Sequence, residues 1–140
     1  MVAVARFGAH LALGTALALA AACSSPPPTV LDGDLPALPG LESVYARNLE
    51  RRDGALVGGR IVFRGRIDDP SRTLDRAIAL YAASGWTVLE RDASSFSGVA
   101  VLGRGDRRCT ISVRSNRIDP AMSQAQIVLG PATPAEPPPS

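Results

Sequence analysis

The chain has 140 residues, fifteen basic residues that are all arginine, one histidine at position 10 and two cysteines. This length allows one domain with terminal tails and argues against two independent cores. The formal net charge is only +2, which by itself does not indicate a nucleic-acid-binding protein.

Residues 1–22 have the layout of a secretory signal peptide: Arg6, an apolar run of about sixteen residues, and small residues at the end. The run is shorter than the roughly twenty residues needed to span a bilayer, so we expect cleavage. Cleavage removes His10 and leaves a chain without histidine or lysine, which lacks the usual general base, nitrogen metal ligand and Schiff-base amine. We therefore expect no enzymatic activity, no cofactor and no metal site.

The five residues that end in Cys23, LAAAC, resemble the lipobox of bacterial lipoproteins, in which the cysteine thiol is acylated and the chain is cut just before it. The family prefers leucine three places before the cysteine, where this chain has Ala20. The resemblance implies a lipid anchor on Cys23, and Ser24 implies sorting to the outer membrane, facing the periplasm. The alternative is ordinary cleavage at the A-x-A pattern of Ala20 and Ala22, which releases a soluble secreted protein.

Proline marks the ends of the expected domain, because ten of the twelve prolines lie in residues 26–39 and 131–139. We expect residues 23–40 to form the lipidated cysteine and a Pro-rich tether, and residues 132–140 to form a disordered tail. Such a tether reaches up to roughly 50 Å at about 3.1 Å per residue. The folded domain is then residues 41–131.

The first half of the domain contains a candidate hairpin. Residues 41–50 fit a strand or, less well, a helix, and RRDGALVGG follows as a hairpin loop. In GRIVFRGRID the residues alternate with a period of two, which predicts a half-buried strand. Its inward residues are Ile61, Phe63 and Ile67, and its outward residues are Arg60, Arg64 and Arg66.

A helix is predicted to begin at Asp69, which can cap it, with Pro70 in the first position. Its buried face comprises Leu74, Ala77, Ile78 and Tyr81, and Gly85 provides a left-handed stop. We expect Asp68 and Asp69 to serve the helix start rather than catalysis, and Tyr81 and Trp86 to be core aromatics.

Four more strands are predicted after the helix, in WTVLER, SGVAVLG, RCTISVR and AQIVLG. Their expected inward sets are Val88 or Leu89; Val99 and Val101; Cys109, Ile111 and Val113; and Ala125, Ile127 and Leu129. Short connections, including a turn at RGD in residues 104–106, favour antiparallel pairing. The prediction is an α+β domain, an antiparallel sheet of five or six strands with one helix packed across it, in the order ββαββββ.

The series SVYAR, GGRIVFRG, a helix ending in YAASGW, RRCTISV and IVLGP resembles a group of short exported bacterial lipoproteins of unassigned function. The likeness covers roughly residues 43–131, and the Phe-Tyr pair often found in the family's helix is reduced here to Tyr81. The resemblance implies the fold and the compartment, and it implies no reaction.

Two features remain as candidate functional sites. Outward arginines could form a face that binds phosphate or carboxylate groups bidentately: Arg47, Arg60, Arg64 and Arg66, with Arg114 if its strand is adjacent. Its partner would be an envelope protein or an anionic polymer or headgroup, and not nucleic acid, since the protein is exported. Cys109 is expected to be a small buried residue; the alternatives are a reactive thiol in a small enzyme that also uses carboxylates, or a disulfide to Cys23.

Overall fold

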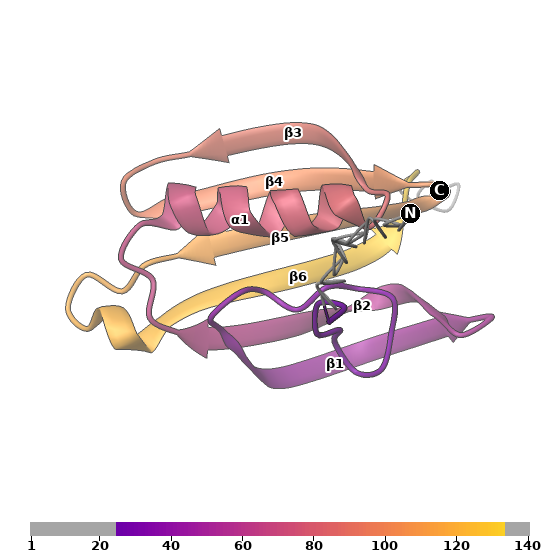
Figure 1. Cartoon of the computed structure of the whole chain (residues 1–140), viewed down its shortest axis with the longest axis horizontal. Helices are drawn as coiled ribbons and strands as arrows, with labels where there is room; N and C mark the ends of the chain where they lie inside the picture. Colours follow the sequence, from indigo (N-terminus) through magenta and orange to yellow (C-terminus); the bar gives the residue numbers. More distant parts are fainter. Residues whose placement is uncertain (1–24, 134–140) are drawn as a thin grey trace, which may run out of the picture.

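Turn and capping residues set the boundaries of the elements in the computed structural model, which describes residues 25–133. Residues 42–133 form six strands, one α-helix and one 3-10 helix, arranged as one antiparallel sheet with the α-helix on one side (Figure 1). The elements are β1 (Glu42–Arg52), β2 (Ala55–Gly65), α1 (Pro70–Ala83), β3 (Thr87–Ala93), β4 (Ser97–Arg104), β5 (Arg107–Arg114), η1 (Pro120–Met122) and β6 (Ser123–Pro131). The strands lie in the order β1-β2-β6-β5-β4-β3. The broad α+β prediction is confirmed, and the domain is mostly sheet.

Two tight hairpins join neighbouring strands. Asp53 and Gly54 connect β1 to β2 with φ values of 51° and 80°, the two positive values of a type I′ turn. The segment that could have been strand or helix is therefore a strand. Gly105, with φ of 60°, is the first of two residues between β4 and β5, as in a type II′ turn, and it places the RGD sequence at a hairpin.

Helix α1 begins and ends where the sequence predicts. The Asp69 side chain accepts a hydrogen bond from the Arg72 amide at 3.0 Å, and Pro70 is the first helical residue. At the other end Gly85 has φ of 88°, the left-handed conformation that stops a helix. Leu74, Ala77 and Tyr81 are buried and Ile78 is partly buried against the core, so the expected apolar face of the helix is confirmed.

The core lies between α1 and one side of the sheet. Ile61, Ile127, Ile111 and Ala100 are paired across four adjacent strands, and all four are buried. The inward sets predicted for β2, β5 and β6 are confirmed, as is burial of Ile67 beyond the end of β2. Trp86 closes the end of the helix, with its ring centroid 5.9 Å from that of Tyr81.

The prediction for β4 is wrong in phase. Ala100 and Leu102 are the buried residues, whereas Val99 is 40% exposed on the other side of the sheet. Both alternating sets of SGVAVLG are apolar, so space under the helix decides between them. A Cβ at Gly98 would lie 3.0 Å from Leu74 Cδ2, so β4 turns the small residues Gly98 and Ala100 toward α1.

Strand β3 also departs from the prediction that Val88 or Leu89 is buried. Val88 is 40% exposed and Leu89 is 55% exposed. The strand forms one edge of the sheet and its register with β4 shifts between Val88 and Glu90. An edge strand with a bulge has no neighbour on its outer side to cover these side chains.

The prediction that residues 23–40 form a tether is wrong for residues 29–40. Val30, Leu35 and Leu38 are part of the core, Thr29 forms an isolated β-bridge with Pro36, and the Tyr81 hydroxyl donates to the Pro36 carbonyl at 3.0 Å. Helix α1 packs on β3, β4 and β5, so another segment must cover the inner side of β2. This N-terminal segment lies on the same side of the sheet as α1 (Figure 1).

The other predicted terminal features lie outside the described residues: the signal peptide 1–22, the lipidated Cys23 and residues 134–140 of the tail. Within residues 25–133, no helix is long and apolar enough to cross a bilayer.

Candidate binding face

The side of the sheet opposite α1 carries the outward residues of every strand. Because register partners in an antiparallel sheet project to the same side, the pairing assigns this side without ambiguity. Besides Arg108, which lies farther along β5, its arginines include Arg47 on β1, Arg60 and Arg64 on β2, and Arg114 on β5. We call this surface the arginine face.

The register brings these arginines into two rows across the sheet. In one row Arg47 lies opposite Arg60, and directly opposite like charges destabilise a sheet. In the other row Arg64 lies opposite Gln124, which lies opposite Arg114. Arg64 and Arg114 are thus two strands, or about 10 Å, apart in their backbones.

Arg47, Arg60, Arg64 and Arg114 form no ion pair among the described residues, and neither do Arg76 and Arg108. Within residues 25–133, six other arginines form ion pairs: Arg52, Arg66, Arg72, Arg91, Arg104 and Arg107. Acidic residues on the same side lie on the edge strands: Glu42, opposite Arg64, and Glu50, opposite Gly58, on β1, and Glu90 and Asp92 on β3. Strands β2 and β5 therefore present guanidinium groups that form no ion pair among the described residues, and β6 places Gln124 between them.

Arg66 was predicted to belong to this set and does not. It lies beyond the end of β2, and its Nε is 3.0 Å from Asp68 Oδ2. Once the strand ends at Gly65, the alternation that would have placed Arg66 beside Arg64 no longer applies. Arg114, whose inclusion depended on an adjacent strand, is separated from β2 by β6 and joins the face through Gln124.

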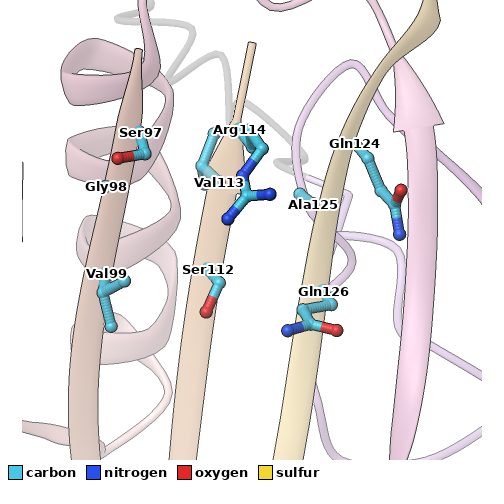
Figure 2. Close-up of a pocket in the computed structure, with 9 residues that line it drawn as sticks. All are labelled: Ser97, Gly98, Val99, Ser112, Val113, Arg114, Gln124, Ala125 and Gln126. Carbon is cyan, nitrogen blue, oxygen red and sulfur yellow. The ribbon is translucent and has the colours of Figure 1, made fainter. Parts of the chain in front are cut away.

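A shallow cavity of about 330 Å³ lies beside Arg114, over β4, β5 and β6. Figure 2 shows Arg114 on β5 between Ser97 of β4 and Gln124 of β6. Ser112 and Gln126 lie in the next row. Two serines between longer side chains make the hollow, and hydroxyl, amide and guanidinium groups line it, all of which can donate hydrogen bonds to an anionic oxygen.

The sequence analysis missed the serines and glutamines of this cavity. The signal was present in the alternation of Gln124 and Gln126 with the buried Ala125 and Ile127. The apolar residues of β6 were correctly predicted to face the core. The polar residues between them must then lie on the opposite side of the sheet. What the sequence did not provide was the register that sets Gln124 between Arg64 and Arg114.

A second polar cluster lies on the covered side. Arg107 Nη2 is 2.7 Å from Asp34 Oδ2, Arg107 Nη1 donates to the Leu56 carbonyl at 2.8 Å, and its guanidinium lies 5.0 Å from the centroid of the Trp86 ring. Arg104 is a longer partner of Asp34 at 3.6 Å. Partial burial alone would raise the pKa of Asp34, but the hydrogen bond and charge of Arg107 outweigh it and hold that pKa below its usual range. This cluster fastens the N-terminal segment to the sheet.

Cys109 lies in the core below this cluster. It is fully buried, and burial raises the pKa of its thiol to about 12. A thiol of this kind is almost entirely protonated near neutral pH, and the thiolate is the nucleophilic form. Among residues 25–133, no three His, Cys, Asp or Glu side chains gather as metal ligands do.

A comparison with protein-family models found no match for this chain, and neither the curated proteins nor the solved structures compared with it gave one.

Proposed function

We propose that this chain is a lipoprotein of the bacterial envelope, anchored through Cys23 in the outer membrane and facing the periplasm, whose domain binds an anionic ligand and catalyses no reaction. The lipobox-like sequence before Cys23 supports the anchor. A leader-cleaved chain has neither histidine nor lysine, and burial with a raised pKa keeps the Cys109 thiol protonated and inaccessible. These features favour a binding module over an enzyme.

The observation that carries the binding proposal is the arginine face itself. Four arginines lie on one uncovered side of the sheet without an ion pair among the described residues, and Arg47 and Arg60 face each other. An anion placed over that pair would relieve their repulsion and accept bidentate hydrogen bonds. Phosphate or carboxylate groups repeated along a polymer suit arginines spread over several strands.

Metabolic labelling with a radioactive or clickable fatty acid tests the anchor. We expect label on the wild-type protein and none on Cys23→Ser, because the thiol is the acceptor in a lipobox. A labelled Cys23→Ser protein would exclude this anchor. An unlabelled wild type released into the medium would instead support the soluble secreted alternative.

Retention on purified cell-wall sacculi tests the arginine face. We expect the triple variant Arg60→Ser, Arg64→Ser and Arg114→Ser to fold and to be retained much less than the wild type. The matched control is Arg72→Ser, Arg76→Ser and Arg117→Ser, which removes the same charge from positions outside the arginine face. Equal losses in the two variants would mean that net charge, and not this face, determines retention.

A further inference from the structure

The docked N-terminal segment limits how far the domain can move from its anchor. Residues 29–40 are fixed by three buried side chains, by the Asp34–Arg107 pair and by the hydrogen bond from the Ala37 amide to the Pro28 carbonyl at 2.9 Å. Cys23 is then separated from the docked residues by only the five residue steps that lead from Cys23 to Pro28. At about 3.1 Å per residue, these five steps reach about 16 Å, far less than an undocked segment would allow.

The chain leaves the domain beside an apolar groove on the helix side. Pro27, Pro28, Leu38, Pro39, Leu41 and Leu80 are among the residues that line it, together with a single charged side chain, Arg76. Its volume is about 710 Å³. The N-terminal segment and α1 both cover the same side of the sheet (Figure 1), so the groove opens away from the arginine face.

We propose that this groove rests on the bilayer that holds the Cys23 lipid, so that the arginine face is turned toward the aqueous compartment; this inference rests on the proposed lipid anchor. An α-helix with its side chains is about 10–12 Å across, and the sheet adds its own thickness. A linker of about 16 Å that starts on the helix side is too short to pass around the domain and let the opposite side lie on the same membrane. The apolar groove at the point of exit suits the boundary between headgroups and acyl chains.

This orientation determines which anions can reach the arginine face. Headgroups of the anchoring membrane would meet α1 and the N-terminal segment. On this side Arg72 pairs with Asp69 and Arg91 of β3 pairs with Asp75, while Arg76 in the groove has no described ion pair. The row of arginines on the opposite side of the sheet would meet whatever lies across the aqueous space. We therefore assign the arginine face to a soluble or cell-wall polymer that bears phosphate or carboxylate groups, and not to the lipids of its own bilayer.

Site-specific fluorescence quenching tests the orientation. The full-length protein is expressed in a bacterium, its lipid is verified by mass, and it is placed in phosphatidylethanolamine–phosphatidylglycerol vesicles with nitroxide on the acyl chains. A fluorophore is attached in turn to Ala79→Cys in the groove and to Gln124→Cys on the arginine face. In the lipidated protein the Cys23 thiol is already blocked by its acyl group, and the Cys109 thiol is buried with a raised pKa. The fluorophore therefore reacts only with the introduced cysteine.

We expect the fluorophore at position 79 to lose most of its emission and the one at position 124 to keep it. An insertion of about fifteen Gly and Ser residues between Ser25 and Pro26 should reduce the difference, because a longer linker lowers the effective concentration of the groove at the membrane. Equal quenching at both positions, or stronger quenching at position 124, would overturn the orientation. Unquenched emission at position 79 in protein whose lipid is verified by mass would mean that the groove does not meet the bilayer, which also overturns the orientation.

Failure of the anchor is distinguishable from failure of the orientation. If the mass shows no lipid, the proposed anchor is wrong. The leader-cleaved protein with Cys23→Ser then carries one reactive amine, at its N-terminus, because the chain has no lysine. Coupling this amine to a vesicle lipid restores a short linker, and the same two fluorophores report the orientation under the same criteria.

Discussion

Arg107 and Arg114 are the first and last residues of the same strand, β5, and they lie in opposite environments: Arg107 is largely buried and Arg114 is exposed. The Arg107 side chain is 11% exposed, and it is held by Asp34, by the Leu56 carbonyl and by the face of Trp86. Arg114 projects from the other side of the sheet with no described ion pair. Side chains alternate along a strand, so two residues that are seven positions apart project to opposite sides of the sheet. The Arg107 guanidinium stabilises the fold, and the Arg114 guanidinium is available to a ligand.

The largest difference between the two sides should appear in core truncations. We expect Ile127→Ala to lower the free energy of unfolding by about 2–5 kcal/mol, because it leaves a cavity in a row of four buried side chains. The neighbouring Gln124→Ala, on the arginine face, should change it by no more than about 0.5 kcal/mol. Urea unfolding followed by circular dichroism measures both. Similar losses would mean that the arginine face is packed in solution.

Asp34→Asn should break the charge pair that fastens the N-terminal segment. The variant leaves the Arg107 guanidinium without its charged partner, and we expect a loss of about 1–3 kcal/mol at pH 7. The pKa of Asp34 is lowered in the folded protein, so its stabilisation is complete above the ordinary value of 3.8 and is lost as the pH falls through the folded pKa.

Unfolding at several pH values checks this sign. Wild type and Asp34→Asn should differ at pH 7 and converge well below pH 3.8, where the carboxyl is protonated in both states. A difference that stays constant down to low pH would show that the amide disturbs packing and that the charge of Asp34 is not the cause. Val30→Ala, which weakens the same segment without removing a charge, is the control and should show a pH-independent loss.

The same comparison explains which parts of the fold the sequence revealed. Capping by Asp69 and the alternation in β6 are local, and both were predicted correctly. The hairpin between β1 and β2 was also predicted, but its loop was expected over residues 51–59, whereas only Asp53 and Gly54 lie between the strands. The phase of β4 depended on the space between Gly98 and Leu74, and burial of Leu35 depended on an uncovered part of the sheet. Neither is a local property. The Pro-rich composition of residues 23–40 suggested a tether, although Val30, Leu35 and Leu38 of this segment complete the core.

The candidate site divides in the same way. Outward positions of Arg60 and Arg64 follow from alternation within one strand, and the sequence supplied them. That Arg47 lies opposite Arg60, and that Gln124 lies between Arg64 and Arg114, depends on strand order and on bulges in β1. Arg66 was misplaced because the alternation predicts no strand end, and Arg107 was overlooked because its partner lies 73 residues away.

Cys109 offers a test of burial from the covered side. Its pKa is raised from 9.0 to about 12, so the folded state favours the thiol and the unfolded state releases the proton first. This contribution is complete below pH 9.0 and declines as the pH rises toward 12, by about 1.4 kcal/mol per pH unit. Wild type should lose stability between pH 8.5 and 10, and Cys109→Ala should lose less over that interval. Rapid reaction of the native thiol with a disulfide reagent at pH 8 would contradict this burial.

The smallest expected change is the most specific to the arginine face. Arg60→Gln removes one of two like charges that lie directly opposite each other, so it should raise the free energy of unfolding by about 0.2–1 kcal/mol. The same change should weaken retention on cell-wall sacculi, because the guanidinium pair is the proposed anion site. Arg72→Gln, which removes a charge that lies beside Asp69, should leave retention unchanged. If Arg60→Gln raises the free energy of unfolding and weakens retention, Arg60 serves ligand binding at a cost in stability. If it lowers both, Arg60 is one of the residues that stabilise the sheet.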